Sequence, residues 1–443
     1  MIVSDLPPRS PGAAAVLGRF APMIYGPTLL FALGEGAILP LIPVIAARLG
    51  ADVATAALVG SALVVGQLCG NIPAGYAVAR IGERFTMAIA GVLALLGVVG
   101  MVVAPGLGVF AASVFVIGFC AAAFGLARHS FMTTRVPLSF RARALSLLGG
   151  TFRLGMFVGP FVSAALIALF GGEAASIWFF GVCLAAVIAL VLLGPDPERA
   201  LRMDEARTDA AASAARAGDT RPGESDTGEP VTTGSVPVLG RARRREGVFR
   251  TMWRHRAVLS RLGVAAASLS AVRSARQVVL PLWGVSIGLD AQTIALVVGV
   301  SGAIDFALFY ASGQVMDRFG RLWAALPAMI LMGAGFLALA FTHDLASADM
   351  WFAMFGAVLG VGNGLSSGIL LTLGADAAPP EDPAPFLGSW RTLTDAGGAL
   401  APLAVSAIAA AASLSVAAAV IGVVGFVGAG AFARWVPRFV PRP

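Results

Sequence analysis

Long apolar stretches alternate with short polar turns along almost the whole chain. A helix needs about 20 mostly apolar residues to cross the hydrocarbon core of a bilayer. Twelve stretches of roughly that length or more occur, in two sets of six. They lie at about 22–48, 54–80, 85–104, 108–130, 143–171 and 174–194, and at about 257–287, 291–316, 323–342, 349–375, 385–411 and 414–436. The pattern predicts an all-α membrane protein with twelve transmembrane helices in two six-helix bundles.

A polar segment separates the two sets of apolar stretches. Residues 195–256 are rich in Ala, Asp, Glu, Ser, Thr, Gly and Arg and have few large apolar residues, which predicts a largely disordered linker. Its last part, 241–256, alternates arginines with apolar residues and could lie on a membrane surface before the seventh stretch. The predicted division is a tail (1–21), a bundle (22–194), the linker (195–256), a second bundle (257–436) and a tail (437–443).

Composition supports the membrane class and bears on orientation. The chain is 58% hydrophobic and only 12% charged, more apolar than a soluble core requires. All of its basic residues are arginine, and they concentrate on one side of the predicted spans. By the positive-inside rule both termini are cytoplasmic, and the Ala-, Gly- and Arg-rich composition is typical of a GC-rich bacterium, hence an inner membrane. The net charge of +7 therefore reflects orientation, and nucleic-acid binding is not expected.

The two sets of stretches share landmarks at a nearly constant separation, which favours a duplication of six helices. The pairs are Pro40 and Pro281, Gly75 and Gly313, Pro137 and Pro379, and Pro160 and Pro402. One pair lies in a short charged phrase that occurs once per set. It reads GQVMDRFGR at 313–321 and GYAVARIGER at 75–84, and each copy joins two apolar stretches.

With this phrase and the duplication, the chain resembles the major facilitator superfamily. That resemblance implies two six-helix halves with a substrate site between them, and a cytoplasmic gating loop after the second helix of each half. The matching gate residues are Gly313, Asp317, Arg318, Gly320 and Arg321, with Gly75, Arg80, Gly82 and Arg84 in the first copy.

Each part of this loop has an expected role. We expect Gly313 to allow close helix contact and Gly320 to form the turn. We expect Asp317 to accept a hydrogen bond from the N-terminus of a neighbouring helix or from an arginine. In the first copy Ala79 stands in place of the acid, which predicts an asymmetric gate.

The fifth stretch carries a second phrase, GGTFRLGMFVGPFVSA at 149–164. It resembles the fifth-helix motif of the twelve-helix drug/proton antiporters, a resemblance that implies export. Gly155 and Gly159 are one turn apart and Pro160 can kink the helix, so simple close packing explains the phrase equally well.

Charged residues inside the apolar stretches are candidates for function, because such a group facing lipid costs at least about 2.5–3.5 kcal/mol. Glu35, Asp305 and Asp395 are the candidate proton-coupling acids. Candidate cavity or charge-partner residues are Arg153, Arg273, Arg276, Arg391, Gln67, Asn71 and Asn363.

Sequence spacing suggests how some of these charges pair. Glu35 and Arg276 occupy equivalent positions in the two halves and could pair in one state of a transport cycle. Arg391 and Asp395 are one turn apart and could satisfy each other. Arg153 has no acid within a turn and must find a partner on another helix or bind an anion.

These features favour a monomeric, non-enzymatic secondary transporter that exports small amphipathic compounds in exchange for protons by alternating access. The expected partners are a small-molecule substrate, protons and the lipid bilayer, with no cofactor and no metal. Two alternatives remain open. One is an uptake symporter or facilitator for an organic anion or nutrient, and the other is a protein of this fold that does not transport.

Overall fold

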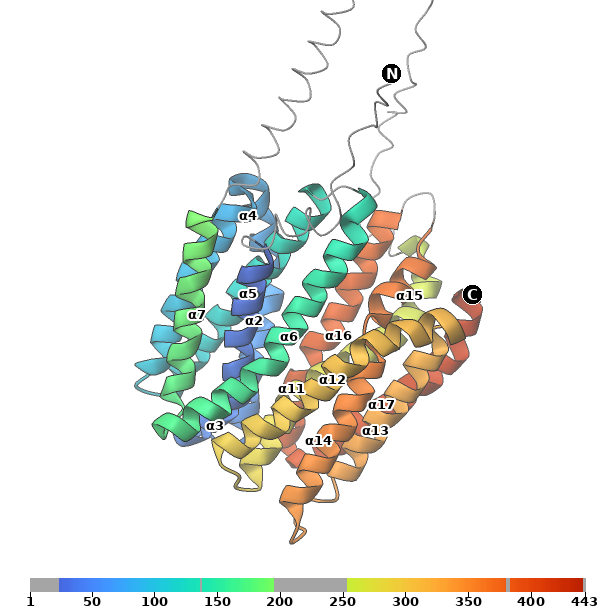
Figure 1. Ribbon diagram of the computed structural model, residues 1–443. Helices are drawn as coiled ribbons and strands as arrows, with labels where there is room; N and C mark the ends of the chain where they lie inside the picture. Colours follow the sequence, from blue (N-terminus) through green and yellow to red (C-terminus); the bar gives the residue numbers. More distant parts are fainter. Residues whose placement is uncertain (1–23, 136–137, 195–252, 380–382, 441–443) are drawn as a thin grey trace, which may run out of the picture.

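The computed structural model describes residues 24–135, 138–194, 253–379 and 383–440. All regular secondary structure within these ranges is helical, and the helices form two bundles that lie side by side (Figure 1). The predicted tails and most of the predicted linker, including the basic segment up to residue 252, lie outside the described residues.

The first bundle contains the helices before the linker. They are α2 (Gly26–Ile38), the 3₁₀ turn η2 (Leu39–Leu41), α3 (Ile42–Arg48), α4 (Val53–Val102), α5 (Leu107–Arg135), α6 (Leu138–Phe170) and α7 (Ala174–Leu193). The first predicted span is divided into α2, η2 and α3 around Pro40 and Pro43. A proline has no backbone N–H to donate to the helix, which explains why the helix divides at these two residues.

The second bundle follows the linker. Its elements are α10 (Arg256–Val258), the π-helical turn η3 (Leu259–Gly263), α11 (Val264–Ser286), α12 (Ala291–Phe319), α13 (Leu322–Leu339), α14 (Ala348–Leu365), α15 (Ile369–Ala377), α16 (Pro383–Ala411) and α17 (Leu414–Phe439). The span predicted at 349–375 is interrupted between α14 and α15, where Gly368 has a positive φ of 79°.

Helix α4 is too long to be one membrane span. Its 50 residues would extend about 75 Å at roughly 1.5 Å per residue, more than twice the hydrocarbon thickness. It is interrupted at Gly82, whose φ of 81° and ψ of 168° turn the chain. Gly320, with φ of 93° and ψ of 165°, forms the equivalent turn after α12. Both gate phrases therefore contain the glycine turn that the sequence predicts.

Ten helices of the described chain are long and apolar enough to cross a membrane. Helix α4 counts once among the ten, and α11, which carries Arg273 and Arg276, is not among them. Twelve crossings require that α4 cross twice and that α11 also cross. The all-helical membrane fold agrees with the sequence, and the number twelve stays a prediction.

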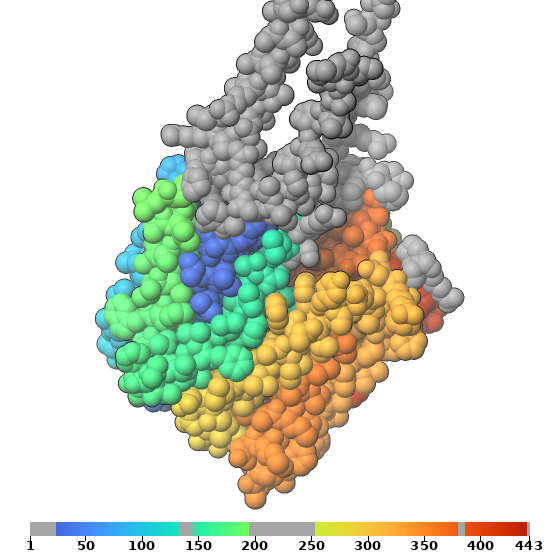
Figure 2. Space-filling view, viewed as in Figure 1, coloured from blue at the N-terminus to red at the C-terminus, as the bar shows by residue number. Residues whose placement is uncertain are grey.

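The two bundles meet along α6 and α12, which run side by side and whose surfaces abut (Figures 1 and 2). Phe157 of α6 stacks on Phe306 of α12, with ring centroids 5.0 Å apart. A buried cluster of Leu41, Val44, Ala291 and Ile294 joins the bundles at the lower end in Figure 1, where α3 ends and α12 begins. The bundles are therefore sealed together at that end.

The small residues of the fifth-helix phrase pack α6 against α2. A Cβ placed on Gly159 would meet the backbone N of Ala37 at 2.6 Å, and one on Gly155 would meet the backbone N of Leu33 at 2.8 Å. The contact is reciprocal, because a Cβ placed on Gly36 of α2 would lie 2.9 Å from the carbonyl O of Met156. Close packing thus accounts for Gly155 and Gly159, whereas a Cβ on Gly149 or Gly150 would meet nothing within 4 Å.

Gly313 differs from the prediction made for it. A Cβ placed there would meet nothing within 4 Å, so this glycine is not a close helix contact. Gly75, its counterpart, would make only an ordinary contact with Leu126, at 3.7 Å. The gate phrases need glycine at the turn, at Gly82 and Gly320, rather than at their first position.

These contacts predict opposite effects of the same substitution at two glycines. Gly159→Ala should lower the free energy of unfolding by about 1–3 kcal/mol, because backbone atoms of α2 cannot move aside for the methyl group. Gly313→Ala should be neutral or slightly stabilising, because alanine is the better helix former. Thermal unfolding in detergent tests both, and an equal Tm for the two variants would contradict the packing described for α6.

Candidate substrate cavity between the two bundles

A cavity of about 560 Å³ lies between the bundles. Helices α2, α4, α5 and α6 line it from the first bundle, and α11, α12, α14 and α16 from the second. A volume of this size accommodates a small organic molecule. The walls combine phenyl rings with a group of charged side chains, so both an apolar and an ionic part of a ligand could be held.

One polar cluster crosses from the first bundle to the second. Arg153 of α6 donates from Nη1 to Oδ1 of Asp305 on α12 (3.2 Å) and to Oγ of Ser367 (2.9 Å). Asn363 of α14 donates to the other carboxylate oxygen of Asp305, at 2.7 Å. The partner that Arg153 requires on another helix is therefore Asp305, and the pair bridges the two bundles beside the break between α14 and α15.

Two further arginines lie on α11 beside this cluster. Arg276 donates to Oγ of Ser301 at 2.7 Å, and Ser301 in turn donates to the carbonyl O of Gly356. Arg273 lines the cavity, makes no hydrogen bond or ion pair within the described chain, and lies within electrostatic range of Arg153, Arg276 and Asp305. Three guanidinium groups thus lie within electrostatic range of the Asp305 carboxylate, and one of them, that of Arg153, bonds to it.

The opposite wall carries Glu35 on α2 and Arg128 on α5, both buried, with 4% and 6% of their surface exposed. The Glu35 carboxylate accepts a long hydrogen bond of 3.5 Å from Nε2 of Gln67, and Arg128 is an opposite charge within electrostatic range. Arg128 donates from Nε to the carbonyl O of Phe124 and lies over the ring of Phe152, while its Nη1 has no partner among the described residues.

Two features of this wall bear on the sequence analysis. Glu35 and Arg276 do not pair in this conformation, since Arg276 donates to Ser301 and Glu35 faces Gln67 and Arg128, so their pairing in another state of the transport cycle stays a prediction. Arg128, which is not among the candidate residues from the sequence, also lines the cavity. Its position inside the apolar stretch 108–130 is the sequence signal that marks it.

The remaining candidates lie on the same walls. Arg391 and Asp395 on α16 form the expected pair one turn apart, at 3.5 Å, and both line the cavity. Asn71 also lines it, from α4. Among the described residues, five arginines and three acids face this space. They are Arg128, Arg153, Arg273, Arg276 and Arg391, and Glu35, Asp305 and Asp395.

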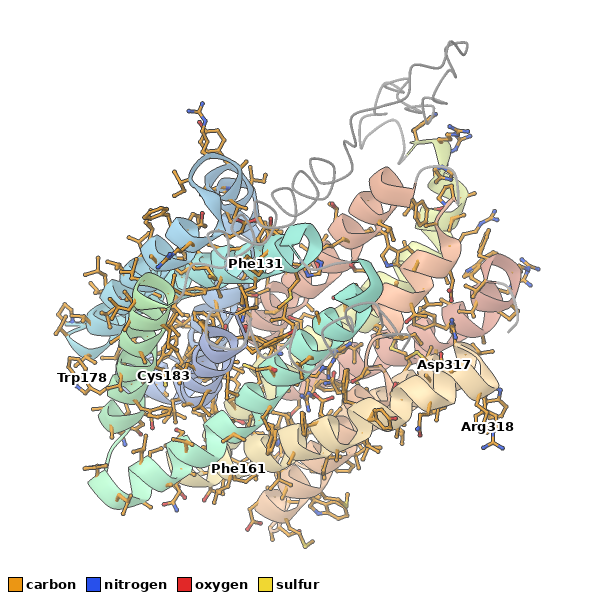
Figure 3. The ribbon with its side chains drawn as sticks, turned by 45° about the horizontal axis from the view of Figure 1, so that its top comes forward. Phe131, Phe161, Trp178, Cys183, Asp317 and Arg318 are labelled. Carbon is orange, nitrogen blue, oxygen red and sulfur yellow. The ribbon has the colours of Figure 1, made fainter. Side chains whose placement is uncertain are left out.

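In the second bundle, an acid outside the gating phrase makes the closest contact with the phrase. The Asp317 side chain is 84% exposed. Its Oδ1 lies 3.6 Å from Nη1 of Arg321, one helical turn further along the chain. Figure 3 shows Asp317 and Arg318 at the outer end of α12, away from the centre. Arg321 instead donates from Nε to Asp376 of α15 at 2.8 Å, and this contact raises its pKa above the ordinary value. Asp376 therefore lies closer to Arg321 than Asp317 does.

The equivalent phrase in the first bundle makes different contacts. Arg84 donates to the carbonyl oxygens of Val191 (2.8 Å) and Leu192 (2.6 Å) at the end of α7, where helix carbonyls have no partner of their own. Glu83 accepts from Ser130 of α5 at 3.1 Å, and Arg80 lies over the ring of Tyr76. The two loops thus differ in their bonding, as the missing acid at Ala79 leads one to expect.

Within the described ranges, no three His, Cys, Asp or Glu side chains converge in a way that could hold a metal ion. The residues that line the cavity offer ion pairing, hydrogen bonding and apolar contact to a ligand.

The family model of the Major Facilitator Superfamily matches residues 27–402. The chain belongs to this superfamily. Its members include transporters whose solved structures share the fold of this chain, although no curated protein gives a significant sequence match.

Three solved members of similar fold illustrate the range. A POT family transporter in complex with a thioalcohol-conjugated peptide has a TM-score of 0.71 at 12% identity, with 96% of each chain covered. A bacterial homologue of the human lysosomal transporter Spinster has a TM-score of 0.66 at 15% identity, covering 97% of this chain and 99% of that one. A D-xylose–proton symporter has a TM-score of 0.64 at 14% identity, covering 97% and 98%.

At these identities the likeness establishes the fold, and the superfamily membership makes the protein a membrane transporter rather than an enzyme. The drug/proton antiporter group stays a prediction, as do proton coupling and the direction of transport.

Proposed function

We propose that this Major Facilitator Superfamily protein is a proton-coupled symporter of small amphipathic organic anions or zwitterions. The observation that carries the proposal is Arg273, a cavity-lining cation with no hydrogen-bond or ion-pair partner in the described chain. A partly buried cation inside a membrane protein is costly when it has no partner. A substrate carboxylate or other anionic group supplies that partner, with Arg276 beside it.

The ring-lined walls supply the apolar part of the proposed recognition. Phe31, Phe152, Phe157 and Phe306 all line the same cavity as the arginines. An aromatic or aliphatic tail can lie against these rings while the anionic group meets Arg273. The substrate class is therefore an amphiphile with one negative end.

The bridge between Arg153 and Asp305 supports coupling to protons. While Asp305 is ionised it holds Arg153, and protonation weakens that bond and frees Arg153 for the substrate anion. Proton and anion then favour each other's binding, since linkage between two ligands is reciprocal. Ligands that bind together are carried together, which is symport.

The same bridge links the proposed binding step to alternating access. Arg153 belongs to the first bundle, whereas Asp305, Asn363 and Ser367 belong to the second. Releasing Arg153 removes a direct tie between the bundles, so they can rock about the α6–α12 contact. Binding of the proton and binding of the substrate thus both lower the free-energy barrier to rocking of the bundles.

The alternative function is proton-coupled export of a cationic amphiphile, with Glu35 as the acid that binds the proton. A cation and a proton would compete for Glu35, and such competition produces exchange. Its support is the fifth-helix phrase, and close packing of Gly155 and Gly159 against α2 accounts for that phrase without any bearing on direction. The excess of arginines over acids in the cavity favours symport of an anion.

The test is proton flux in proteoliposomes with an imposed pH gradient. Three membrane-impermeant probes of similar size are compared: an aryl sulfonate, a zwitterionic aromatic amino acid and a quaternary arylammonium ion. We expect the sulfonate or the zwitterion to move protons in its own direction. Proton movement opposite to the arylammonium ion would favour the exporter. No response above protein-free liposomes to any probe would contradict both.

A further inference from the structure

Three arginines from two separate elements meet on one indole ring at the end of the second bundle. The guanidinium carbons of Arg261, Arg434 and Arg438 lie 4.9, 5.4 and 5.2 Å from the ring centroid of Trp435. Arg261 belongs to η3, and the others belong to the last two turns of α17. We call these four residues the Trp435 patch.

The Trp435 patch has unbalanced positive charge. An indole has two faces, so at least two of the three guanidinium groups share one face and lie close together. The three arginine side chains are exposed, and none forms an ion pair with an acid in the described chain. Attraction to the ring positions each guanidinium group, but it does not cancel the repulsion between the three positive charges.

The position of the patch along α17 places it at the surface of a bilayer. About 20 residues span the hydrocarbon core. Counted from Leu414, the start of α17, that length ends near Ala433, directly before Arg434 and Trp435. On α11 the same count back from Ser286 ends near Ala267, and Arg261 lies beyond it. Both elements therefore bring their arginines to headgroup depth, where tryptophan is also favoured.

We propose that the Trp435 patch is a binding site for the phosphodiester of an anionic phospholipid. The phosphate accepts from two arginines that share a face of the ring, and the indole lies at the headgroup level beside it. A zwitterionic lipid fits less well, because its ammonium or choline group brings a further cation to a site that already holds three. The site is separate from the central cavity and does not depend on the proposed substrate.

Three other arginines of the chain provide a matched control. Arg80, Arg256 and Arg318 are exposed and each lies over an aromatic ring, of Tyr76, Trp253 and Phe319 respectively. Each of these rings has a single arginine in contact with it among the described residues. Changing all three to glutamine removes the same charge and the same number of ring contacts as changing Arg261, Arg434 and Arg438.

The experiment measures phosphatidylglycerol retained by the purified full-length protein, by native mass spectrometry and by the lipid-induced rise in Tm. We expect wild type and the control triple variant to bind this lipid alike and in preference to phosphatidylcholine. The triple variant Arg261→Gln, Arg434→Gln, Arg438→Gln should bind it at least tenfold more weakly. If that variant does not fold, Arg438→Gln compared with Arg318→Gln should show the same order with a smaller difference.

Two outcomes would overturn the proposal. Equal lipid retention by the patch variant and the control variant would show that the three arginines on Trp435 are not a site. Competition by inorganic phosphate or glycerol 3-phosphate as strong as that of the lipid would show a site for small phosphates in place of a lipid.

Discussion

Replacing Arg273 by glutamine is expected to weaken binding of an anionic substrate by roughly a hundredfold while leaving the fold intact. A hydrogen bond to a charged group contributes about 1.5–3 kcal/mol, and about 1.4 kcal/mol corresponds to a tenfold change in affinity. Arg273 has no bonded partner in the described chain, so its removal leaves no buried group unsatisfied. It also removes a cation beside Arg153 and Arg276, so the Tm should stay the same or rise.

The matched control is Arg391→Gln. Arg391 lines the same cavity, but it already pairs with Asp395 and its side chain is 62% exposed. We expect that change to reduce affinity by no more than a few-fold. Equilibrium binding of the aryl sulfonate or the zwitterion, measured by calorimetry together with Tm, distinguishes the two positions. Equal losses at both would mean that the cavity acts through its overall charge and that Arg273 has no special part.

The sequence predicted the parts of the fold that depend on local chemistry. Apolar length gave the helices, and the glycines at 82 and 320 marked the turns in both gating loops, where a positive φ is needed. The requirement that Arg153 find a partner elsewhere followed from the cost of a charge in an apolar span. Each of these inferences uses residues within a few turns of one another.

The identity of the contacts between helices could not be predicted in the same way. Asp376 bonds Arg321 in place of Asp317, because α15 begins after a break whose direction is set by Gly368 and its surroundings. Arg128 faces the cavity because of the rotation of α5 about its axis. Such rotations depend on how whole helices pack, and pseudo-symmetry between the halves is too coarse to give them.

Changing Asp305 to asparagine is expected to uncouple transport from protons. Asparagine resembles the protonated acid in shape and cannot ionise, so Arg153 is held weakly at every pH. A gradient of one pH unit can drive about tenfold accumulation when one proton accompanies each substrate, since each unit is worth about 1.4 kcal/mol. Wild type should approach that accumulation and Asp305→Asn should show none. Exchange of labelled for unlabelled substrate should continue in the variant within about threefold of the wild-type rate.

Glu35→Gln and Asp395→Asn serve as the comparison, because both acids line the cavity but neither contacts Arg153. We expect both variants to retain gradient-driven accumulation. If Glu35→Gln loses accumulation while Asp305→Asn remains coupled, then Glu35 is the acid that carries the transported proton, and the exchange mechanism is favoured.

Arg153→Gln alone should lower the Tm, since it leaves the Asp305 carboxylate with Asn363 as its remaining hydrogen-bond donor in the described chain. Adding Asp305→Asn to that variant should restore part of the loss, because the pair is then removed together and no buried charge is left unpaired.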